Sequence, residues 1–472
     1  MALKEWRDLA RDARWRWPFA ATLLLMLAAL VLGRQQAHAL AHEHQHAMAA
    51  DHALWTAQSA KNPHAAAHFG QYAFKPSGPL AMAEPGIDAF VGRAIWLEAH
   101  KQNEAQFRAA RDGTLSARMG QLQLGFVLQV VLPLVALLLG FSAVAVEREQ
   151  GTLRSLLSLG ASPVQLLLGK ALAHGAVLLA LVLLAAAGLL LGAGTGAEGG
   201  TAGNTLGPQA LLRIGAWLGL HALYALTLLL AAMAVAAVLP QPRLALMLLL
   251  GFWLINSFLA PRWVSDVLRA TDPLPTAQAF RAAIAQDKKK LFGHDEKHPG
   301  FIAFRDRVLQ QYGVARVEDL PVSFRGLSLR EDDHAGYRLF DLHFGRLWAQ
   351  IEAQDARRAS FGWVFPMLAV QPLSMALAGT DNRHQHHFVR QAEAHRRFIQ
   401  DSLSQDLIDH ARPGDNAYVA DPQLWKRIPP LRYQAPDVSW SMDAHRGPAL
   451  ALLGWWLLAL LALLAAARRW QA

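Results

Sequence analysis

The chain has 472 residues, of which 53% are hydrophobic and 17% are charged, so it is more apolar than an ordinary soluble domain. The absence of cysteine excludes a disulfide framework and thiolate chemistry. The net charge of +9 has the sign that nucleic acids attract. However, the basic residues gather beside apolar runs rather than in one long patch, so we expect no nucleic-acid partner.

Runs of mostly apolar residues divide the chain. Each has roughly 17 residues or more, the length that crosses about 30 Å of hydrocarbon. Each should be a helix, because lipid offers no hydrogen bonds to unpaired backbone groups. The runs lie at residues 17–33, 122–146, 171–193, 211–239, 244–260 and 448–467. We therefore predict an all-α polytopic membrane protein with six transmembrane helices.

Lysine and arginine are distributed unevenly over the connections between these runs. They are frequent in residues 4–16, before the first run, and they occur in 147–170, between the second and third runs. Arg468 and Arg469 follow the last run, whereas the connection 194–210 has neither residue type. Because cytoplasmic connections carry the excess of positive charge, we expect both termini and the 147–170 loop to be cytoplasmic. An even number of spans agrees with this topology.

The N-terminal segment 1–33 is expected to hold a cytoplasmic interfacial helix followed by the first span. In residues 3–16, apolar side chains such as Trp6 and Leu9 lie on one side and charges lie opposite, as in helices that rest on a membrane surface. A cleaved signal peptide is the alternative, because residues 37–39 have the A-x-A form of a cleavage site. The apolar run is long for a signal peptide, which favours a retained anchor.

Two long polar segments predict a periplasmic domain built from two insertions. The first covers residues 34–121 and the second covers 261–447. Aromatic residues and periodic apolar positions in both segments indicate folded rather than disordered chain. We expect a mainly α-helical domain, with an α or α+β fold. The remaining parts are the membrane region 122–260 and the last span with its cytoplasmic tail, 448–472.

The second insertion has the clearer helical periodicity. Two sets of apolar residues recur at helical spacing, and each set predicts a helix with one buried face. The sets are Phe340, Phe344, Leu347, Trp348 and Ile351, and Phe388, Ala392, Ile399 and Leu403. Between them, residues 361–378 are apolar but contain Pro366 and Pro372. We expect this segment to be a buried or membrane-skimming hairpin rather than a seventh span.

The connection between the second and third runs has a charged turn followed by a short amphipathic segment, residues 147–157. Leu153, Leu156 and Leu157 are spaced i, i+3 and i+4, so they share one face of a helix. We expect this face to lie on the membrane surface or to fit a groove on a soluble partner.

This connection resembles the loop after the second span of ABC-2-type transporter permeases. The similar positions are Glu147, Arg148, Glu149, Gly151, Thr152 and Leu153, then Gly160-Ala161-Ser162-Pro163 and Leu168-Gly169-Lys170. Later segments resemble one bacterial branch of these permeases, whose members carry a large extracytoplasmic insertion. These segments are His298-Pro299-Gly300, Gln311-Tyr312-Gly313-Val314, Val317-Glu318-Asp319-Leu320-Pro321 and residues 374–381.

The resemblance implies a half-transporter in the bacterial inner membrane. Such a subunit pairs with a second copy of itself or with a sister permease, and separate ABC ATPase subunits bind ATP and magnesium below the pair. The resemblance also implies a coupling helix at about 147–160 on which the ATPase subunits push. Its residues in this chain would be Glu147, Arg148, Glu149, Gly151, Thr152, Leu153, Leu156 and Leu157.

A nucleotide site on this chain itself is not expected. A phosphate-binding loop needs the pattern G-x-x-x-x-G-K-[ST] after a strand. Gly169 and Lys170 are followed by Ala171 and open an apolar run. We therefore expect a non-catalytic transmembrane subunit with no catalytic or cofactor-binding residues of its own.

Histidine is concentrated in the two insertions, which hold eight and ten of the 20 histidines. His38, His42 and His46 are spaced i, i+4 and i+8 on one helix face, with His44 beside them. Imidazoles four residues apart can share zinc or copper, so these four side chains are candidate metal ligands. The alternative is a polar stalk, rich in alanine and histidine, that leaves the membrane.

A second group of histidines lies in a segment that resembles the bacterial branch, so we expect a structural role for it, with metal binding as the alternative. Its members are Asp381, His384, His386, His387 and His395. Inside the apolar runs, His221 and Asn256 are functional-site candidates, or else they make an interhelical hydrogen bond or a dimer contact. Gln129 and Pro133 indicate packing or a kink in the second span.

These observations predict the permease subunit of an ATP-driven ABC-2-type exporter, which couples ATP hydrolysis on separate subunits to substrate movement across or out of the inner membrane. Two alternatives are open: an ATP-driven mechanotransmission or assembly scaffold that acts on periplasmic partners, and a copper- or zinc-handling membrane protein. A membrane-embedded enzyme is disfavoured, because the sequence has no convergent catalytic set. The expected partners are the ATPase subunits, a second permease, membrane lipids and a periplasmic or outer-membrane protein.

Overall fold

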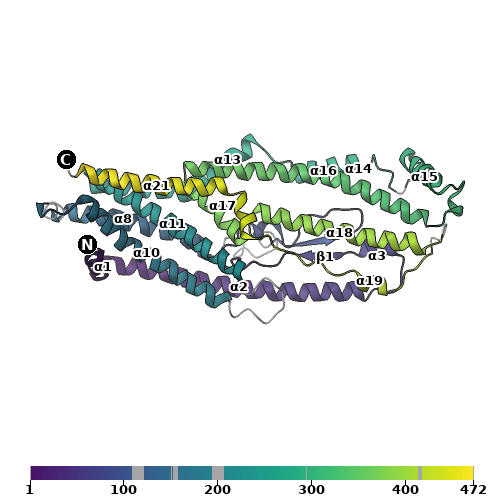
Figure 1. Ribbon diagram of the computed structural model, residues 1–472, viewed down its shortest axis with the longest axis horizontal. Helices are drawn as coiled ribbons and strands as arrows, with labels where there is room; N and C mark the ends of the chain where they lie inside the picture. Colours follow the sequence, from purple (N-terminus) through teal and green to yellow (C-terminus); the bar gives the residue numbers. More distant parts are fainter. Residues whose placement is uncertain are drawn as a thin grey trace.

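The computed structural model describes residues 2–108, 122–149, 151–152, 158–193, 207–293, 295–412 and 417–470. The molecule is elongated, with a helical bundle at one end and an extramembrane domain at the other (Figure 1). Both termini lie at the end of the bundle that is remote from this domain, which we call the terminal end (Figure 1). The chain is 76% helical with few strand residues, so the prediction of an all-α polytopic membrane protein is confirmed.

Six helical segments of the described chain are long and apolar enough to cross a membrane. They are α2 (Arg16–Thr56); α7 (Leu124–Phe126), which continues through η2 (Val127–Val131) into α8 (Leu132–Glu149); α10 (Pro163–Ala193); α11 (Pro208–Val238); α12 (Pro242–Leu254), which continues through η3 (Ile255–Leu259) into α13 (Ala260–Thr271); and α21 (Arg446–Arg469). The helix α11 contacts α8, α10, α12 and α21, so it is the central helix of the bundle.

The first span continues into the extramembrane domain without a break. The boundary expected after residue 33 therefore lies inside one helix, α2. Residues 34–56 contain no glycine or proline and many alanines, which favours continued helix. Near the end of α2, Trp55 is fully buried, and its Nε1 donates to the carbonyl of Trp425 at 2.9 Å. This contact fixes the far end of the helix within the domain.

The interfacial helix expected over residues 3–16 is shorter in the structure. It comprises α1 (Ala2–Arg11), followed by the 3₁₀ turn η1 (Ala13–Trp15). Asp12 separates the two because its side chain caps η1 by accepting the N–H of Arg14 at 3.0 Å. Glu5 is buried where α1 packs on α10, whereas Trp6 is 43% exposed.

Two spans contain a π-helical segment, η2 and η3. Each segment ends two residues before a proline, Pro133 in the second span and Pro261 in the fifth. A proline ring crowds the carbonyl four residues earlier and has no N–H to bond to it. A wider helical turn accommodates both effects. The structure thus has an irregularity at the position where Gln129 and Pro133 predict one.

The extramembrane domain combines elements from both insertions. From the first come α3 (Pro63–Phe69), β1 (Gln71–Phe74), α4 (Asp88–Val91) and β2 (Ala94–Leu97). From the second come α14 (Ala277–Lys288), α15 (Pro299–Tyr312), η4 (Val317–Asp319), α16 (Phe324–Ser360), η5 (Phe361–Trp363), α17 (Met367–Ala378), α18 (Asn382–His410), α19 (Gln423–Arg427) and α20 (Val438–Asp443). The two strands pair antiparallel, with Gln71 opposite Leu97.

The core of the domain forms where α18 packs on α16, α3 and β2. The residues predicted to form a buried helical face in this segment are all buried in α18; they are Phe388, Ala392, Ile399 and Leu403. In the other predicted helix, α16, Phe340 is buried and Phe344 is half-buried. The buried face of α18 is therefore confirmed. The segment of α16 is a helix as predicted, but its expected face is only partly buried, since Leu347, Trp348 and Ile351 are half-buried.

Most of residues 361–378 are buried as expected, although Trp363 and Val364 are exposed, and the segment does not form a hairpin. The short turn η5 leads into a single helix, α17, which packs against α11 and α21 of the bundle. Leu368, Ala369 and Val370 have no exposed surface. Pro372 lies inside α17 without ending it. A proline within a helix costs roughly 3 kcal/mol, and the burial of α17 among other helices offsets that cost.

A close contact between α8 and α11 predicts that one added methyl group at Gly140 lowers the stability of the bundle. A Cβ on Gly140 would lie 2.5 Å from the carbonyl oxygen of Leu229 and 2.8 Å from Cβ of Ala232. Gly140→Ala should therefore lower the stability of the bundle by about 1–3 kcal/mol, the usual cost of overpacking. The melting temperature of the purified variant in detergent measures this loss.

Gly219→Ala is the matched control, because a Cβ on this glycine of α11 would have no atom of the described residues within 4 Å. It should keep or raise the melting temperature, since alanine has the higher helix propensity. Equal stability of the two variants would contradict the tight contact at Gly140.

Candidate functional site

A turn of the first insertion enters the end of the bundle opposite the termini. This turn, residues 78–84, is named here the junction turn, and it packs within the buried cluster of the spans. A Cβ on Gly33 of α2 would overlap the carbonyl of Met82, and a Cβ on Gly125 of α7 would lie 2.7 Å from Oε2 of Glu84. Glycine at both positions therefore lets the junction turn lie directly against the two helices.

Glu84 of the junction turn belongs to a buried polar group that we call the junction cluster. Its Oε2 accepts hydrogen bonds from Nε2 of Gln129 and from Oγ of Ser374, both at 2.7 Å. Trp217 donates through Nε1 to the same serine hydroxyl at 2.7 Å. Nε2 of His221 lies 3.4 Å from Nε2 of Gln129. The cluster thus joins the first insertion, the second span, α11 and α17.

The junction cluster is closed to solvent, and its members form hydrogen bonds with one another. Glu84 is 8% exposed and Gln129 is 6% exposed, while Ser374, Trp217 and His221 have no exposed surface. Nδ1 of His221 donates to the carbonyl of Trp217 at 2.7 Å, which leaves Nε2 to accept from Gln129. Burial raises the pKa of the Glu84 carboxyl, and the hydrogen bonds from Ser374 and Gln129 oppose this shift.

Arg213, near the start of α11, is bonded at the same junction to α17, to the segment before α20 and to α20 itself. Its guanidinium donates to the carbonyl of Leu377 at 2.9 Å and to that of Pro436 at 2.6 Å. It also donates to Oγ of Ser441 at 3.2 Å. Because the side chain is only 7% exposed, these charge-assisted bonds form away from water.

Asn256 in η3 links the fifth span to α11 and α17. Its Nδ2 donates to the hydroxyl of Tyr224 at 2.8 Å, and its Oδ1 accepts the N–H of Met367 at 3.0 Å. The second contact satisfies an otherwise unpaired donor at the start of α17. Of the alternatives for this intramembrane polar residue, the structure favours interhelical hydrogen bonds.

Three charged side chains meet at the terminal end, at the base of the connection between α8 and α10. Nζ of Lys170 lies 2.8 Å from Oε2 of Glu5 and 2.8 Å from Oε1 of Glu147. The side chains of Lys170, Glu5 and Glu147 are 4%, 9% and 14% exposed. This ion cluster ties α1, α8 and α10 together.

Arg148 fixes the end of α8 to the end of α11. Its guanidinium donates to the carbonyls of Ala236 at 3.0 Å and Ala237 at 2.8 Å, and also to the carbonyl of Leu239. A cation here satisfies the last carbonyls of α11 and interacts favourably with the helix dipole. The first two residues expected in the coupling helix, Glu147 and Arg148, thus contact the bundle itself.

The chain leaves α8 through a left-handed turn. Gly151 has φ +72°, a conformation that glycine adopts without steric cost. The hydroxyl of Thr152 donates to the carbonyl of Glu147 at 3.2 Å. The remaining expected coupling positions lie outside the described residues, and their role stays a prediction; they are the side chain of Glu149 and residues Leu153, Leu156 and Leu157.

The candidate metal ligands of the first insertion lie on α2, but the helix does not bring all of them together. His38, His42 and His46 are exposed, and Nε2 of His42 lies 3.2 Å from Nε2 of His46. His44 lies on another face and packs against Phe74, with ring centroids 5.5 Å apart. Among the described residues, no group of three possible ligands forms around these histidines. Metal binding by them stays a prediction.

The second histidine group makes separate contacts along α18. Nδ1 of His384 lies 2.5 Å from Oδ1 of Asp381, which also caps the helix by accepting the N–H of His384 at 2.8 Å. His386 stacks on Trp348 with ring centroids 4.6 Å apart. His387 lies 3.2 Å from the hydroxyl of Tyr433. These contacts are of the structural kind expected from the sequence.

Glu84 and Glu5 were not among the candidates predicted from the sequence, and Ser374 appeared only within the segment 374–381 that resembles the permease branch. Ser374 had a usable signal, because a polar side chain inside the apolar segment 361–378 implies a buried partner. Glu84 had none, since it stands in a loop whose partners lie 45 and 290 positions away along the chain.

Comparisons with known proteins divide the chain at α14. A sequence model described as "ABC-2 family transporter protein" matches residues 1–287, which include all the spans except α21. A model described as "Domain of unknown function (DUF3526)" matches residues 277–434, which include α16, α17 and α18. No curated protein matches the chain.

The junction cluster predicts a pH dependence of stability. The pKa of Glu84 in the folded state lies above its ordinary value of 4.5, so the folded chain keeps a proton that the unfolded chain releases as the pH rises past that value. Folding stability should therefore fall by about 1.4 kcal/mol per pH unit up to the raised pKa. Glu84→Gln removes this titration. The melting temperature of the variant minus that of wild type should therefore be larger at pH 8 than at pH 5.

Glu296→Gln, a change of an exposed carboxylate remote from the bundle, provides the control and should track wild type at both pH values. If Glu84→Gln shows the same difference from wild type across the pH range, Glu84 is not the buried titrating group described here.

The ion cluster at the terminal end predicts a stability loss that compensating changes reverse. Lys170→Met leaves the carboxylates of Glu5 and Glu147 buried without a cation, which should cost about 3–5 kcal/mol. The triple variant that adds Glu5→Gln and Glu147→Gln should recover much of this loss. Melting temperatures in detergent give both values, and a single variant as stable as wild type would rule out a buried ion cluster.

Proposed function

Because the chain belongs to the ABC-2 family of transporter proteins, we propose that it is the permease subunit of an ATP-driven transporter in the bacterial inner membrane. The members of this family are non-catalytic membrane components. In this proposal ATP is hydrolysed on separate ABC ATPase subunits, and this chain converts their movement into movement of a substrate across or out of the membrane.

The observation that carries the proposal is the placement of the connection between α8 and α10. The end of α8 and the start of α10, which this connection joins, lie at the terminal end with both termini, and the extramembrane domain lies at the opposite end (Figure 1). The terminal end is also where Arg468 and Arg469 follow the last span, as expected of a cytoplasmic face. We therefore assign the terminal end to the cytoplasm, with the ATPase subunits, and the extramembrane domain to the periplasm.

The contacts at the base of the connection support a coupling role. Glu147 is held by Lys170, and Arg148 is held by the last carbonyls of α11. A displacement of the end of α8 is therefore passed to α10 through the largely buried Glu147–Lys170 contact, and to α11 through the half-buried bonds of Arg148. This makes α11 the helix that carries movement into the bundle.

At its other end, α11 supports transmission to the extramembrane domain. Arg213 and Trp217 bond to α17, which lies between the bundle and the domain. Movement of α11 would then move the domain with it. A scaffold that acts on periplasmic partners would use the same coupling and would differ only in whether cargo passes between the spans.

Exposed apolar side chains on the outer helices are compatible with lipid contact and with a second permease subunit. Leu172 and Leu183 of α10 are 69% and 68% exposed, and Met247 of α12 is 64% exposed. Apolar surface of this extent is stable in hydrocarbon or against another apolar helix. We therefore include a second copy of this chain, or a sister permease, in the proposed complex.

The left-handed turn at Gly151 provides the test of the coupling role. A valine at this φ is strained by about 1–2 kcal/mol, although none of the described residues lies within 4 Å of a Cβ at this position. Gly151→Val should thus redirect the connection without disturbing the bundle. We expect about tenfold weaker association with the ATPase subunits, measured by co-purification from the native host and by the ATPase activity of the complex.

Gly293→Val is the matched control, because Gly293 also has positive φ (+53°) and no atom of the described chain within 4 Å of a Cβ, but lies in the extramembrane domain. It should retain the ATPase subunits. Retention by Gly151→Val, or an equal loss in both variants, would contradict a specific coupling role for the connection.

A further inference from the structure

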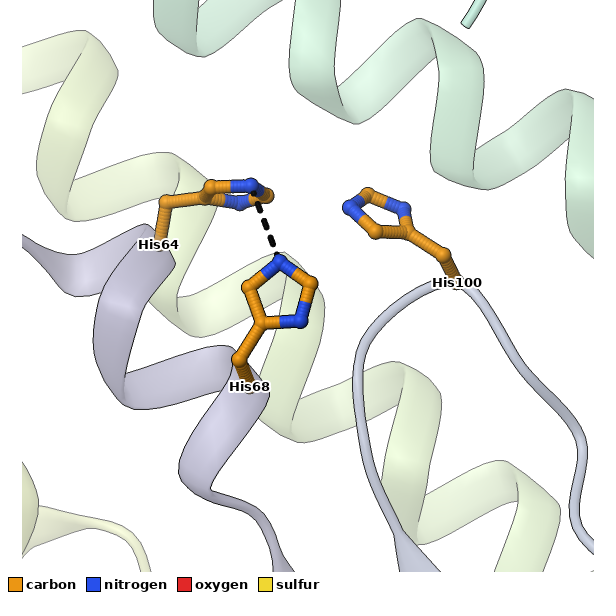
Figure 2. A group of neighbouring side chains, drawn as sticks. All are labelled: His64, His68 and His100. Carbon is orange, nitrogen blue, oxygen red and sulfur yellow. Dashed lines mark hydrogen bonds between the residues drawn. The ribbon is translucent and has the colours of Figure 1, made fainter.

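Three histidine rings converge in the extramembrane domain, away from the junction cluster. His64 and His68 lie on α3, and His100 lies in the loop after β2. Figure 2 shows the three rings turned toward one another from two separate chain segments. One ring nitrogen from each lies within 4.8 Å of the others, and no other group of three such ligands is found in the described part of the chain.

The spacing of the ring nitrogens fits a metal ion with tetrahedral geometry. Nε2 of His64 lies 3.3 Å from Nε2 of His68. Two nitrogens bound at about 2.0–2.1 Å to a tetrahedral ion are about 3.3–3.4 Å apart. The His100 ring is almost equally distant from both, with centroids 5.2 Å from His64 and 5.3 Å from His68. The third ring therefore faces the middle of the pair.

The local fold presents His64 and His68 on the same side of α3. Asn62 caps the helix by accepting the N–H of His64 at 3.0 Å. Ala66 and Ala67 are buried on the side of α3 that packs on α18. With this side buried, the i, i+4 histidine pair is left on the side that faces the loop after β2.

The backbone and a buried carboxylate hold His100 in place. The N–H of Ala99 donates to the carbonyl of Ala67 at 3.0 Å, which joins the loop to α3. His100 has φ +60°, an uncommon conformation for a residue with a side chain. Oδ1 of Asp333, whose side chain is 5% exposed, lies 3.0 Å from Nδ1 of His100. A carboxylate on one ring nitrogen orients the ring and favours the other nitrogen as a metal ligand.

We propose that His64, His68 and His100 form a binding site for a divalent transition metal ion, with Zn²⁺ the best match. Three neutral imidazoles suit Zn²⁺ and leave its fourth position for water or an exchangeable ligand. Asp333 acts through His100 as the second-shell carboxylate and partly balances the charge of the ion. This site goes beyond the proposed function, because it requires neither ATP nor a second permease.

Zinc binding to the full-length chain tests the proposal directly. The protein is purified in detergent with an affinity tag that contains no histidine, stripped with a chelator and titrated with Zn²⁺ alone in a calorimeter. We expect one tight site per chain and a higher melting temperature with Zn²⁺. His68→Ala and His100→Ala should each weaken this site by more than about 100-fold, and Asp333→Asn should weaken it by about 10–100-fold.

The double variant His42→Ala/His46→Ala is the matched control, because it removes an exposed histidine pair whose Nε2 atoms are 3.2 Å apart on α2. It should keep the tight site. The exposed position of His68 means that His68→Ala should fold normally, which its melting temperature without metal verifies. Tight zinc binding that survives in His68→Ala and His100→Ala, or that is lost only with His42 and His46, would overturn the proposal.

Discussion

The hydrogen bonds that Arg213 donates to α17 and to the segment before α20 bind the bundle to the extramembrane domain. The junction cluster around Glu84 adds a second buried link between the same parts. Arg213 and Glu84 lie in the region that matches the ABC-2 family, whereas α17 lies in the region that matches the domain of unknown function. The second region is therefore built into the end of the bundle, and it is not a separate unit on a tether.

The helix α11 is bonded at both of its ends to the parts that the proposed mechanism needs to connect. At the terminal end, the last carbonyls of α11 accept hydrogen bonds from the guanidinium of Arg148. Arg148 lies near the end of α8, just before the connection to α10. At the other end, Arg213 and Trp217 reach α17. The bonds of Arg213 and Trp217 are largely buried and those of Arg148 are half-buried, and polar bonds shielded from water are costly to break without replacement. A rigid central helix therefore links the surface proposed for the ATPase subunits to the domain proposed for the periplasm.

The helices could be predicted from the sequence because they depend on local composition. The buried contacts between residues far apart in the chain could not. The six spans and the buried face of α18 were correct because length and periodicity are local properties. The hairpin expected at 361–378 was wrong, because the packing of α17 against other helices keeps it a single helix through Pro372. Glu84 and His100 were missed because their partners come from other segments. Only the i, i+4 spacing of His64 and His68 was visible in advance.

The claim that bundle and extramembrane domain move as one body is tested most directly by a distance measurement between two spin labels. The chain has no cysteine, so Leu457→Cys on α21 and Leu342→Cys on α16 introduce two label sites, and both leucines are exposed. Pulsed electron paramagnetic resonance on the full-length chain should give one narrow distance distribution, which Arg213→Ala should broaden. A broad or multiple distribution in the otherwise unchanged chain would contradict a rigid junction.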